Sequence, residues 1–572
     1  MIERVIKEKI NFKHPYLTKQ IIAYIGNKRR LLPLIYEALK GCQLEKLGRH
    51  VFLDLFAGSG VVSRFAKYMN FHVISNDWEY YTFLINKPYL EIHERDLPRL
   101  FREHGGMENI LRELNNLQGP PIEDQFIARY YSPSDGDIES LDFRKERMFY
   151  TKENGLIIDK IRNRIEDLYP EETINNSDIK RREKYLLIAL LLYESATHTN
   201  TSGVFKAYHK GFGGHNRDAL SRILAPISLK QPVLINSDFD AEVYCEDVFT
   251  LVNSEKLRSR NIDIVYVDPP YNQHQYGSNY HLLNTIGRWD KPMVTNELNE
   301  RGVLKDKAAI RKDWVATRSD YCYRDRAQEA FSRLLESIDA KHILLSYSTE
   351  GIIPFDVMMA MCAEKGEIDI VTNEYTKYRG GKQSIDRLNR NIEFVMIIHT
   401  GRKNTKKTIN KIECVLSRKM LGLLLRKKYT QKKLKQNFTI SGDGGSIQLP
   451  GTDLVLRTRS YFELIPSLDI EALSTDKVCT LIDRLEKSVC IDKEEELQEI
   501  MRIIREGGSN REYFVKKIPD TLKKFAHKKY KKTFNKWLCR VKSLKDQDAQ
   551  LYWIIEDRVM DIERLALKRF NN

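Results

Sequence analysis

Apolar residues along this chain fall into short runs separated by longer segments with one apolar face. The run at 51–56 precedes an Ala-Gly-Ser-Gly turn and a segment whose apolar residues share one helical face. This order predicts a strand, a turn and a helix. Further runs typical of strands lie at 71–76, 261–268 and 341–348, and the pair 367–375 and 392–399 predicts a closing hairpin. Alternating strands and helices favour an α/β fold with a mostly parallel sheet and helices on both faces.

The spacing of these runs predicts three regions. Residues 1–87 and 241–400 carry the strand pattern and are expected to form one domain. A helical insertion at 88–240 interrupts this domain and includes a strongly apolar helical pattern at 185–196. Beyond residue 400, the basic polar run at 401–411 indicates a linker, and residues 401–572 are predicted to form an extra domain.

Charge is distributed unevenly between these regions. The chain has a net charge of +15; residues 1–400 sum to zero, and residues 401–572 carry the whole excess. A basic module of this kind is typical of a surface that binds a polyanion. The alternative is a solvated lysine-rich face. Tyr530, Phe534 and Trp537 lie among these basic residues, where they would be partly packed and partly available for contacts.

The cysteine spacing and the hydropathy of the chain indicate the redox state of its thiols and its cellular location. The eight cysteines are scattered, and no pair has the two-residue spacing of a zinc knuckle or a redox motif. The first 20 residues contain no apolar signal core, and no stretch is long and apolar enough to span a membrane. We therefore expect reduced thiols and a cytoplasmic protein.

The most informative motif is Asp268-Pro269-Pro270-Tyr271, directly after the apolar run Ile-Val-Tyr-Val. Two consecutive prolines cannot continue a hydrogen-bonded ladder, so they hold a rigid turn at the carboxyl end of the strand. Open α/β sheets bind their ligands at this edge. These four residues, called here the DPPY box, are therefore candidate catalytic residues.

The DPPY box, the sequence FLDLFAGSG at 52–60 and the sequence YIGNK at 24–28 together resemble the alpha-group, DPPY-type N6-adenine DNA methyltransferases. The resemblance covers roughly residues 20–400 and is greatest to adenine methylases of type II restriction–modification systems. It implies a Rossmann-like fold that binds S-adenosyl-L-methionine and methylates N6 of an adenine flipped out of double-stranded DNA. It also implies a bacterial cytoplasmic enzyme, with a cognate restriction endonuclease as a candidate partner.

The resemblance assigns a role to each part of the box. The Asp268 carboxylate and the Pro269 carbonyl would accept the two N–H bonds of the adenine amine and draw the nitrogen towards sp3 geometry. Tyr271 would stack on the extruded base and offset part of the cost of unstacking it. Because a sulfonium methyl group is already activated, positioning supplies much of the rate and no metal is required.

Cofactor contacts are implied for the first strand and the turn after it. Asp54 and Phe56 lie at the end of the strand, and Gly58 and Gly60 let the backbone approach a ligand at a helix N-terminus. Asp77 follows the second strand, where an acidic residue typically accepts hydrogen bonds from ribose hydroxyls.

Further contacts are implied for residues outside this turn. Lys28 would pair with the methionine carboxylate, and Tyr24 would pack against the cofactor. Asp247 resembles the residue that recognises the cofactor's adenine amine. Ser346 and Tyr347, at another strand end, resemble a motif that helps line the target-base pocket.

Two regions are candidates for DNA recognition. The insertion 88–240 occupies the position of the target-recognition region in this family, and residues 401–572 are an additional candidate DNA-binding domain. Within the insertion, the stretch 199–218 is rich in glycine and in side chains that can meet phosphates or base edges; a polar surface loop is the alternative. The candidate DNA contacts are Lys206, His209, Lys210, Asn216 and Arg217.

The motifs are compatible with alternative functions. An RNA adenine as the target is disfavoured by the DNA-specific layout of the motifs. An N4-cytosine methyltransferase would use the same chemistry, although the acidic first residue of the box favours adenine in this family. A methyltransferase–endonuclease fusion would need a nuclease in 401–572, where no convincing pair of carboxylates with a following Glu-x-Lys is found. A DNA-binding protein that has lost catalysis is disfavoured by the intact DPPY box.

Overall fold

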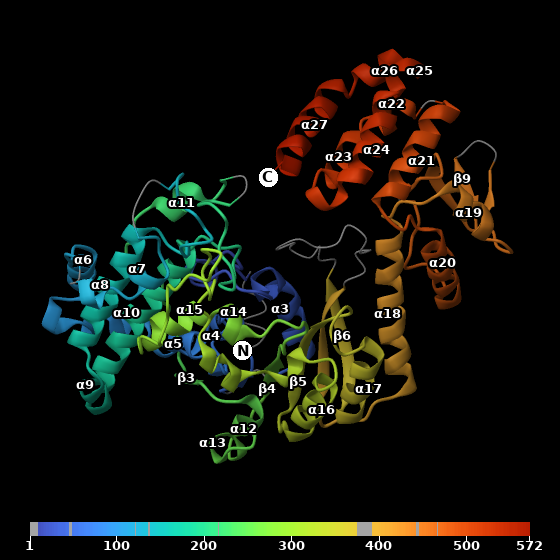
Figure 1. The fold of residues 1–572 in the computed structure, drawn as a ribbon. Helices are drawn as coiled ribbons and strands as arrows, with labels where there is room; N and C mark the ends of the chain where they lie inside the picture. Colours follow the sequence, from blue (N-terminus) through green and yellow to red (C-terminus); the bar gives the residue numbers. More distant parts are fainter. Residues whose placement is uncertain are drawn as a thin grey trace. The chain divides into compact units, whose positions relative to one another are not determined.

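The chain divides into two compact units. Unit 1 comprises Met1–Asn373 and Glu393–Thr408, and unit 2 includes Ile409–Asn572 (Figure 1). No helix in the described part of the chain combines the length and the apolarity needed to cross a bilayer. The computed structural model describes residues 10–44, 49–119, 122–134, 138–214, 217–373, 392–441, 445–465, 467–508 and 510–571.

The described residues of unit 1 form a seven-stranded sheet in the order β3-β2-β1-β4-β5-β7-β6. Neighbouring strands from β3 to β5 are parallel, whereas β7 runs antiparallel to both β5 and β6. This arrangement confirms the predicted α/β fold and its closing hairpin. The strands are β1 (Val51–Asp54), β2 (His72–Asn76), β3 (Ala241–Tyr244), β4 (Ile264–Val267), β5 (His342–Ser348), β6 (Glu367–Asn373) and β7 (Glu393–His399).

Strand order places a crevice at the carboxyl ends of β1 and β4. From β1 the chain proceeds outward through β2 to β3, and from β4 it proceeds in the opposite direction to β5. The connections on either side of β1 and β4 therefore diverge, and open α/β sheets bind ligands at such a switch point. In the register of these two parallel strands, Asp54 lies opposite Tyr266. The turn after β1 and the DPPY box after β4 therefore emerge at the same edge of the sheet.

Helices cover the sheet on both faces, which explains why all four residues of β4 are buried. Helices α4 and α5 pack on the β1–β3 side and α3 packs on β6 and β7, while α12, α16 and α17 pack against one another in a row (Figure 1). The helices are α3 (Leu32–Gly41), α4 (Val61–Tyr68), α5 (Tyr80–Glu91), α12 (Val248–Val252), α16 (Ala327–Ser337) and α17 (Phe355–Lys365).

The structure differs from the sequence-based expectation at β3 and α5. Strand β3 was not predicted, because it has only four residues and alternates buried and half-buried positions at the sheet edge. Helix α5 continues to Glu91 with Pro88 inside it and packs on β2 and β3, so it belongs to the sheet layer beyond the expected boundary at residue 87.

Most of the region between α5 and β3 is helical. Helix α10 confirms the apolar helical pattern at 185–196, and it packs along α5 and α15. After the DPPY box the chain enters two short helices, α14 (Tyr276–Asn279) and α15 (His281–Arg288). The helices before β3 are α6 (Met107–Asn115), α7 (Ile127–Tyr130), α8 (Lys152–Leu168), α9 (Glu171–Asn176), α10 (Asp178–Thr197) and α11 (Leu220–Leu224).

Unit 2 combines a small sheet with helices. The expected linker after residue 400 is wrong from Lys406 onwards, because a 19-residue helix, α18 (Lys406–Leu424), begins there. The described residues include a four-stranded sheet, β8 (Thr439–Ile440), β9 (Ser446–Gln448), β10 (Val455–Arg459) and β11 (Glu463–Leu464). The remaining longer helices are α19 (Gln431–Asn437), α20 (Thr475–Ser488), α21 (Lys493–Glu506), α24 (Lys531–Lys542) and α27 (Glu556–Asn571).

Candidate active site

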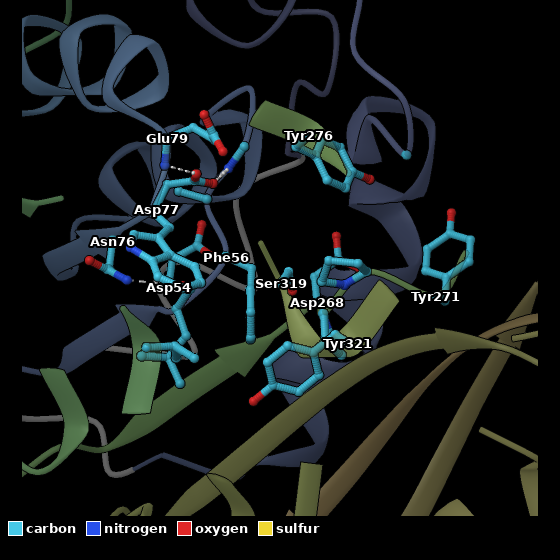
Figure 2. Close-up of a pocket in the computed structure, with 18 of the residues that line it drawn as sticks. Asp54, Phe56, Asn76, Asp77, Glu79, Asp268, Tyr271, Tyr276, Ser319 and Tyr321 are labelled. Atoms are coloured by element: carbon cyan, nitrogen blue, oxygen red, sulfur yellow. Dashed lines mark hydrogen bonds between the residues drawn. The ribbon is translucent and has the colours of Figure 1, made fainter. Parts of the chain in front are cut away.

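The carboxyl ends of β1, β2 and β4 open into a cavity of about 330 Å³, a size typical of small-molecule sites. All four residues of the DPPY box line it (Figure 2). So do all the candidate cofactor residues except Gly60: Tyr24, Lys28, Asp54, Phe56, Gly58, Asp77 and Asp247. Sequence segments from the first 30 residues to beyond residue 240 thus converge on one pocket.

The turn after β1 (Ala57–Gly60, called the glycine turn) requires glycine at two positions. Gly58 and Gly60 have φ angles of +49° and +75°. A Cβ atom on Gly58 would lie 2.7 Å from the Tyr24 ring, and one on Gly60 would lie 1.7 Å from the Asn86 side chain. Gly60 caps the N-terminus of α4 instead of lining the cavity, so its role is to let the helix begin there.

Buried carboxylates line the cavity beside the glycine turn. Asp77 accepts hydrogen bonds from the backbone amides of Gly58 (2.8 Å) and Glu79 (2.9 Å), and this contact ties the turn to the end of β2 (Figure 2). Asp54 accepts a hydrogen bond from the Ser63 hydroxyl (2.6 Å). Burial raises the pKa of both Asp54 and Glu79 to about 7 and also raises the pKa of Asp77. Asp54 and Glu79 are therefore about half protonated near pH 7, and a cationic ligand bound beside them would favour their ionised forms.

The DPPY box is held by an ion pair that was not predicted. Lys28 Nζ lies 3.0 Å from Asp268 Oδ1, and the Lys28 side chain is only 3% exposed. The same ammonium lies 4.9 Å from the centre of the Tyr271 ring. Burial raises the pKa of Asp268 to about 6, and Lys28 limits that rise. In this structure Lys28 thus faces the Asp268 carboxylate, whereas the resemblance implied a partner on the cofactor.

An aromatic stack joins the N-terminal motif to the segment after the box. The Tyr24 ring stacks on Tyr276 and Tyr280, at centroid distances of 5.2 and 4.9 Å. The backbone amide of Ile25 donates to the Tyr280 hydroxyl (2.8 Å). These contacts hold residues 24–28 against α14 and α15. They thereby place Lys28 within ion-pair distance of Asp268.

Residues 312–323, called here the wall segment, complete one side of the cavity. Ser319 and Tyr321 line it, and the Tyr321 ring packs edge-on against Phe56 at 5.3 Å (Figure 2). Sequence reasoning missed both residues, because the wall segment lies in an irregular stretch and matches no motif.

Gln275 and Glu79 are among the side chains that hold the wall segment in place. Gln275, 7% exposed, donates to the Ser319 carbonyl (3.1 Å) and accepts from the Ser319 amide (2.9 Å). Glu79 accepts hydrogen bonds from the Thr317 hydroxyl and the Asn284 amide, both at 2.8 Å. Gln275 and Glu79 are thus positioning residues for the cavity wall.

With the cofactor that the resemblance implies, a Gln275→Ala variant should show about 10-fold weaker binding, because it removes both hydrogen bonds that hold the wall segment at Ser319. Isothermal titration with S-adenosylhomocysteine measures this directly. Ser319→Ala keeps both backbone partners of Gln275 and so measures separately any contribution of the Ser319 hydroxyl, which lines the cavity. Equal affinities for Gln275→Ala and the wild type would rule out this role for the wall segment.

The candidate DNA contacts lie outside the cavity lining. Lys206 and Lys210 are exposed, His209 is half-buried, and Arg217 is exposed and paired with Glu139. Asn216 lies outside the described residues. The loop that carries them is anchored to α14 and α15, since the Phe205 amide donates to the Asn279 carbonyl (2.7 Å) and the Phe205 carbonyl contacts His281 Nε2 (3.0 Å).

Asp247 and Tyr347, two further candidates from the sequence, both make contacts near the cavity. Asp247 caps α12 by accepting from the Thr250 amide (3.0 Å), and it also lines the cavity. Tyr347 packs edge-on against Tyr271 at 5.7 Å, and its hydroxyl accepts from the Ile353 amide. Tyr347 therefore supports the tyrosine of the DPPY box.

Comparison with known proteins gives consistent matches. The chain is 29% identical over 389 residues to modification methylase LlaI of Lactococcus lactis subsp. lactis, covering 67% of this chain and 56% of that protein. It is 31% identical over 363 residues to type II methyltransferase M.NlaIII of Neisseria lactamica, covering 63% and 93%. With type II methyltransferase M.FokI of Planomicrobium okeanokoites it shares 30% over 377 residues, covering 65% and 52%. The chain thus spans about half the length of LlaI and M.FokI.

A family profile gives the most direct assignment. The profile of the D12 class N6 adenine-specific DNA methyltransferases matches residues 24–361, more than half of the chain. This range contains the glycine turn, the DPPY box and every residue that lines the cavity. The chain therefore belongs to the D12 class N6 adenine-specific DNA methyltransferases.

Proposed function

We propose that the protein transfers a methyl group from S-adenosyl-L-methionine to N6 of an adenine flipped out of double-stranded DNA. One observation carries this proposal: the DPPY box at the end of β4 and the glycine turn at the end of β1 line the same cavity. The acceptors proposed for the adenine amine and the turn proposed to bind the cofactor therefore face one cavity, at the switch point of the sheet.

The residues around the glycine turn fit this cofactor. Gly58 lines the cavity and lets the backbone come close to a ligand near the start of α4, while Gly60 lets that helix begin. The carboxylates of Asp54, Asp77 and Glu79 suit a ligand that carries a sulfonium and an ammonium group. The bound cofactor would supply an electrophilic methyl group on that sulfonium.

The DPPY box would act on the adenine amine. The Asp268 carboxylate and the Pro269 carbonyl are acceptors for its two N–H bonds, and accepting both would leave the nitrogen lone pair free to attack. Tyr271, backed by Tyr347, offers an aromatic face for the extruded base. After transfer the nitrogen is a strong acid, and its extra proton passes to water.

We also infer that the enzyme modifies DNA for a restriction–modification system, with a cognate endonuclease as partner. The names of the relatives support this inference: LlaI is a modification methylase, and M.NlaIII and M.FokI are type II methyltransferases. Single-molecule sequencing of DNA from cells that express the protein would reveal the recognition sequence.

Nucleoside mass spectrometry tests the proposed reaction. Duplex DNA incubated with the protein and S-adenosylmethionine should yield N6-methyladenine after digestion. N4-methylcytosine would instead support the alternative base, and the absence of any methylated nucleoside on DNA of all sequences would refute the proposal.

A further inference from the structure

Unit 2 carries a dense cluster of lysines at one place. Residues 523–532 hold six lysines and no acidic residue, and all six are exposed. We call this cluster the lysine patch: Lys523, Lys524, Lys528, Lys529, Lys531 and Lys532.

The backbone beneath the lysine patch is firmly held. Phe525 is 4% exposed and Ala526 is fully buried in the helical core of unit 2. The chain here forms two short 3₁₀ turns (Lys523–Phe525 and Lys528–Tyr530) and then enters α24. Arg569 near the end of α27 donates to the Ala526 carbonyl (3.0 Å). The ammonium groups are thus presented from a folded surface.

Unit 2 contains carboxylates that form ion pairs with other lysines but not with those of the lysine patch in the described residues. Other lysines nearby in sequence are paired: Lys536 with Glu494, Lys542 with Glu563 and Lys545 with Glu556, at 2.5 to 3.0 Å. Within the described ranges, none of the six patch lysines forms an ion pair. Six like charges within ten residues repel one another, so this arrangement opposes folding unless an anion compensates it.

We propose that the lysine patch binds the phosphate backbone of double-stranded DNA and adds affinity that does not depend on base sequence. The inference rests on the proposed function for the choice of duplex DNA as the polyanion. Lysines are compact point charges that suit phosphate oxygens, and neutralising phosphates releases counterions.

The neighbouring aromatic residues favour a duplex over a single strand. Proteins that bind single strands usually present aromatic rings on which unpaired bases stack. Here Phe534 and Trp537 are each 1% exposed, and Tyr530 packs partly buried against the same core. Phe534 and Trp537 therefore offer no stacking face, which corrects the expectation that they were partly available, while Tyr530 is partly packed as expected.

Two triple variants of the full-length protein test this proposal. Lys523→Gln/Lys528→Gln/Lys532→Gln removes patch charges, and Lys536→Gln/Lys542→Gln/Lys545→Gln removes the same net charge from the paired lysines. Fluorescence anisotropy with a 30-bp duplex over a range of salt concentrations measures binding. The patch variant should bind at least about 10-fold more weakly near 0.1 M salt, and its salt slope should fall by up to about 2.7, as expected for three lost phosphate contacts. The paired-lysine variant should change affinity less than about 3-fold.

Equal losses in the two variants would overturn the proposal, because bulk charge alone would then explain them. A patch variant that loses affinity for single-stranded RNA but keeps its affinity for the duplex would overturn it as well. Methyl transfer at saturating DNA separates this inference from the proposed function. An unchanged kcat with a raised KM for DNA supports both, whereas patch-dependent DNA binding by a wild-type protein that transfers no methyl group would refute only the proposed function.

Discussion

An Asp268→Asn variant is expected to lose methyl transfer by about 100- to 1,000-fold in kcat, with an affinity for S-adenosylhomocysteine close to that of the wild type. The asparagine amide is isosteric with the carboxylate, but it is neutral and a weaker acceptor. Its NH2 group is a donor and cannot accept a hydrogen bond from the adenine amine. Removing one preorganised polar partner of a reaction centre has an effect of roughly this size. Single-turnover kinetics with tritiated cofactor measure the chemical step.

Asp263→Asn is the matched control for this substitution. Asp263 lies just before the amino end of β4, is 5% exposed, and pairs with Lys341 (2.8 Å) and with the Val51 amide (2.9 Å). Its loss should lower thermal stability and leave kcat within about 3-fold. If Asp268→Asn kept more than a tenth of the wild-type kcat, Asp268 would not hold the reacting amine.

The second large effect is expected in Lys28→Met, through the pH dependence of the reaction. Asp268 must be ionised to be a strong acceptor, so wild-type kcat should fall as the pH drops through about 6, the raised pKa of this carboxyl. Removing the Lys28 ammonium leaves the carboxylate buried without its partner cation, and its pKa then rises further. The acid limb of the profile should therefore move to higher pH by about two units, with activity near pH 7 reduced about 10-fold and largely recovered near pH 9.

Lys28→Arg separates this charge effect from a packing effect. Arginine keeps a cation beside Asp268, so the acid limb should stay near pH 6 even if the longer side chain lowers the maximal rate. A profile for Lys28→Met that overlaps the wild-type profile would show that Lys28 does not set the ionisation of Asp268.

Much of the sheet could be predicted because its strands are buried on both faces. The runs that became β1, β4 and β5 are continuous apolar stretches, and a double proline or a glycine turn follows two of them. Strand β3 escaped prediction because it is a four-residue edge strand in which Glu242 alternates with buried residues and pairs with Arg260. Local sequence cannot show that such a short segment has a partner strand.

The residues of the candidate site also fall into those that the sequence predicted and those that it did not. The DPPY box and the glycine turn were found because each is a contiguous motif whose backbone needs proline or glycine. Ser319 and Tyr321 were missed because only the folded chain brings them to the cavity, and Gln275 was missed because its partner Ser319 lies 44 residues further along the chain. Lys28 was expected at the cofactor, and its proximity to Asp268 follows from the stacking of Tyr24 on Tyr276 and Tyr280, a contact between segments about 250 residues apart.

A crystal structure of the protein with duplex DNA and a non-reactive cofactor analogue would test the central claim most directly. The account predicts a flipped adenine whose N6 lies about 3 Å from both an Asp268 carboxylate oxygen and the Pro269 carbonyl oxygen, with the analogue against the glycine turn. An adenine amine held elsewhere, or an analogue bound away from residues 57–60, would contradict it.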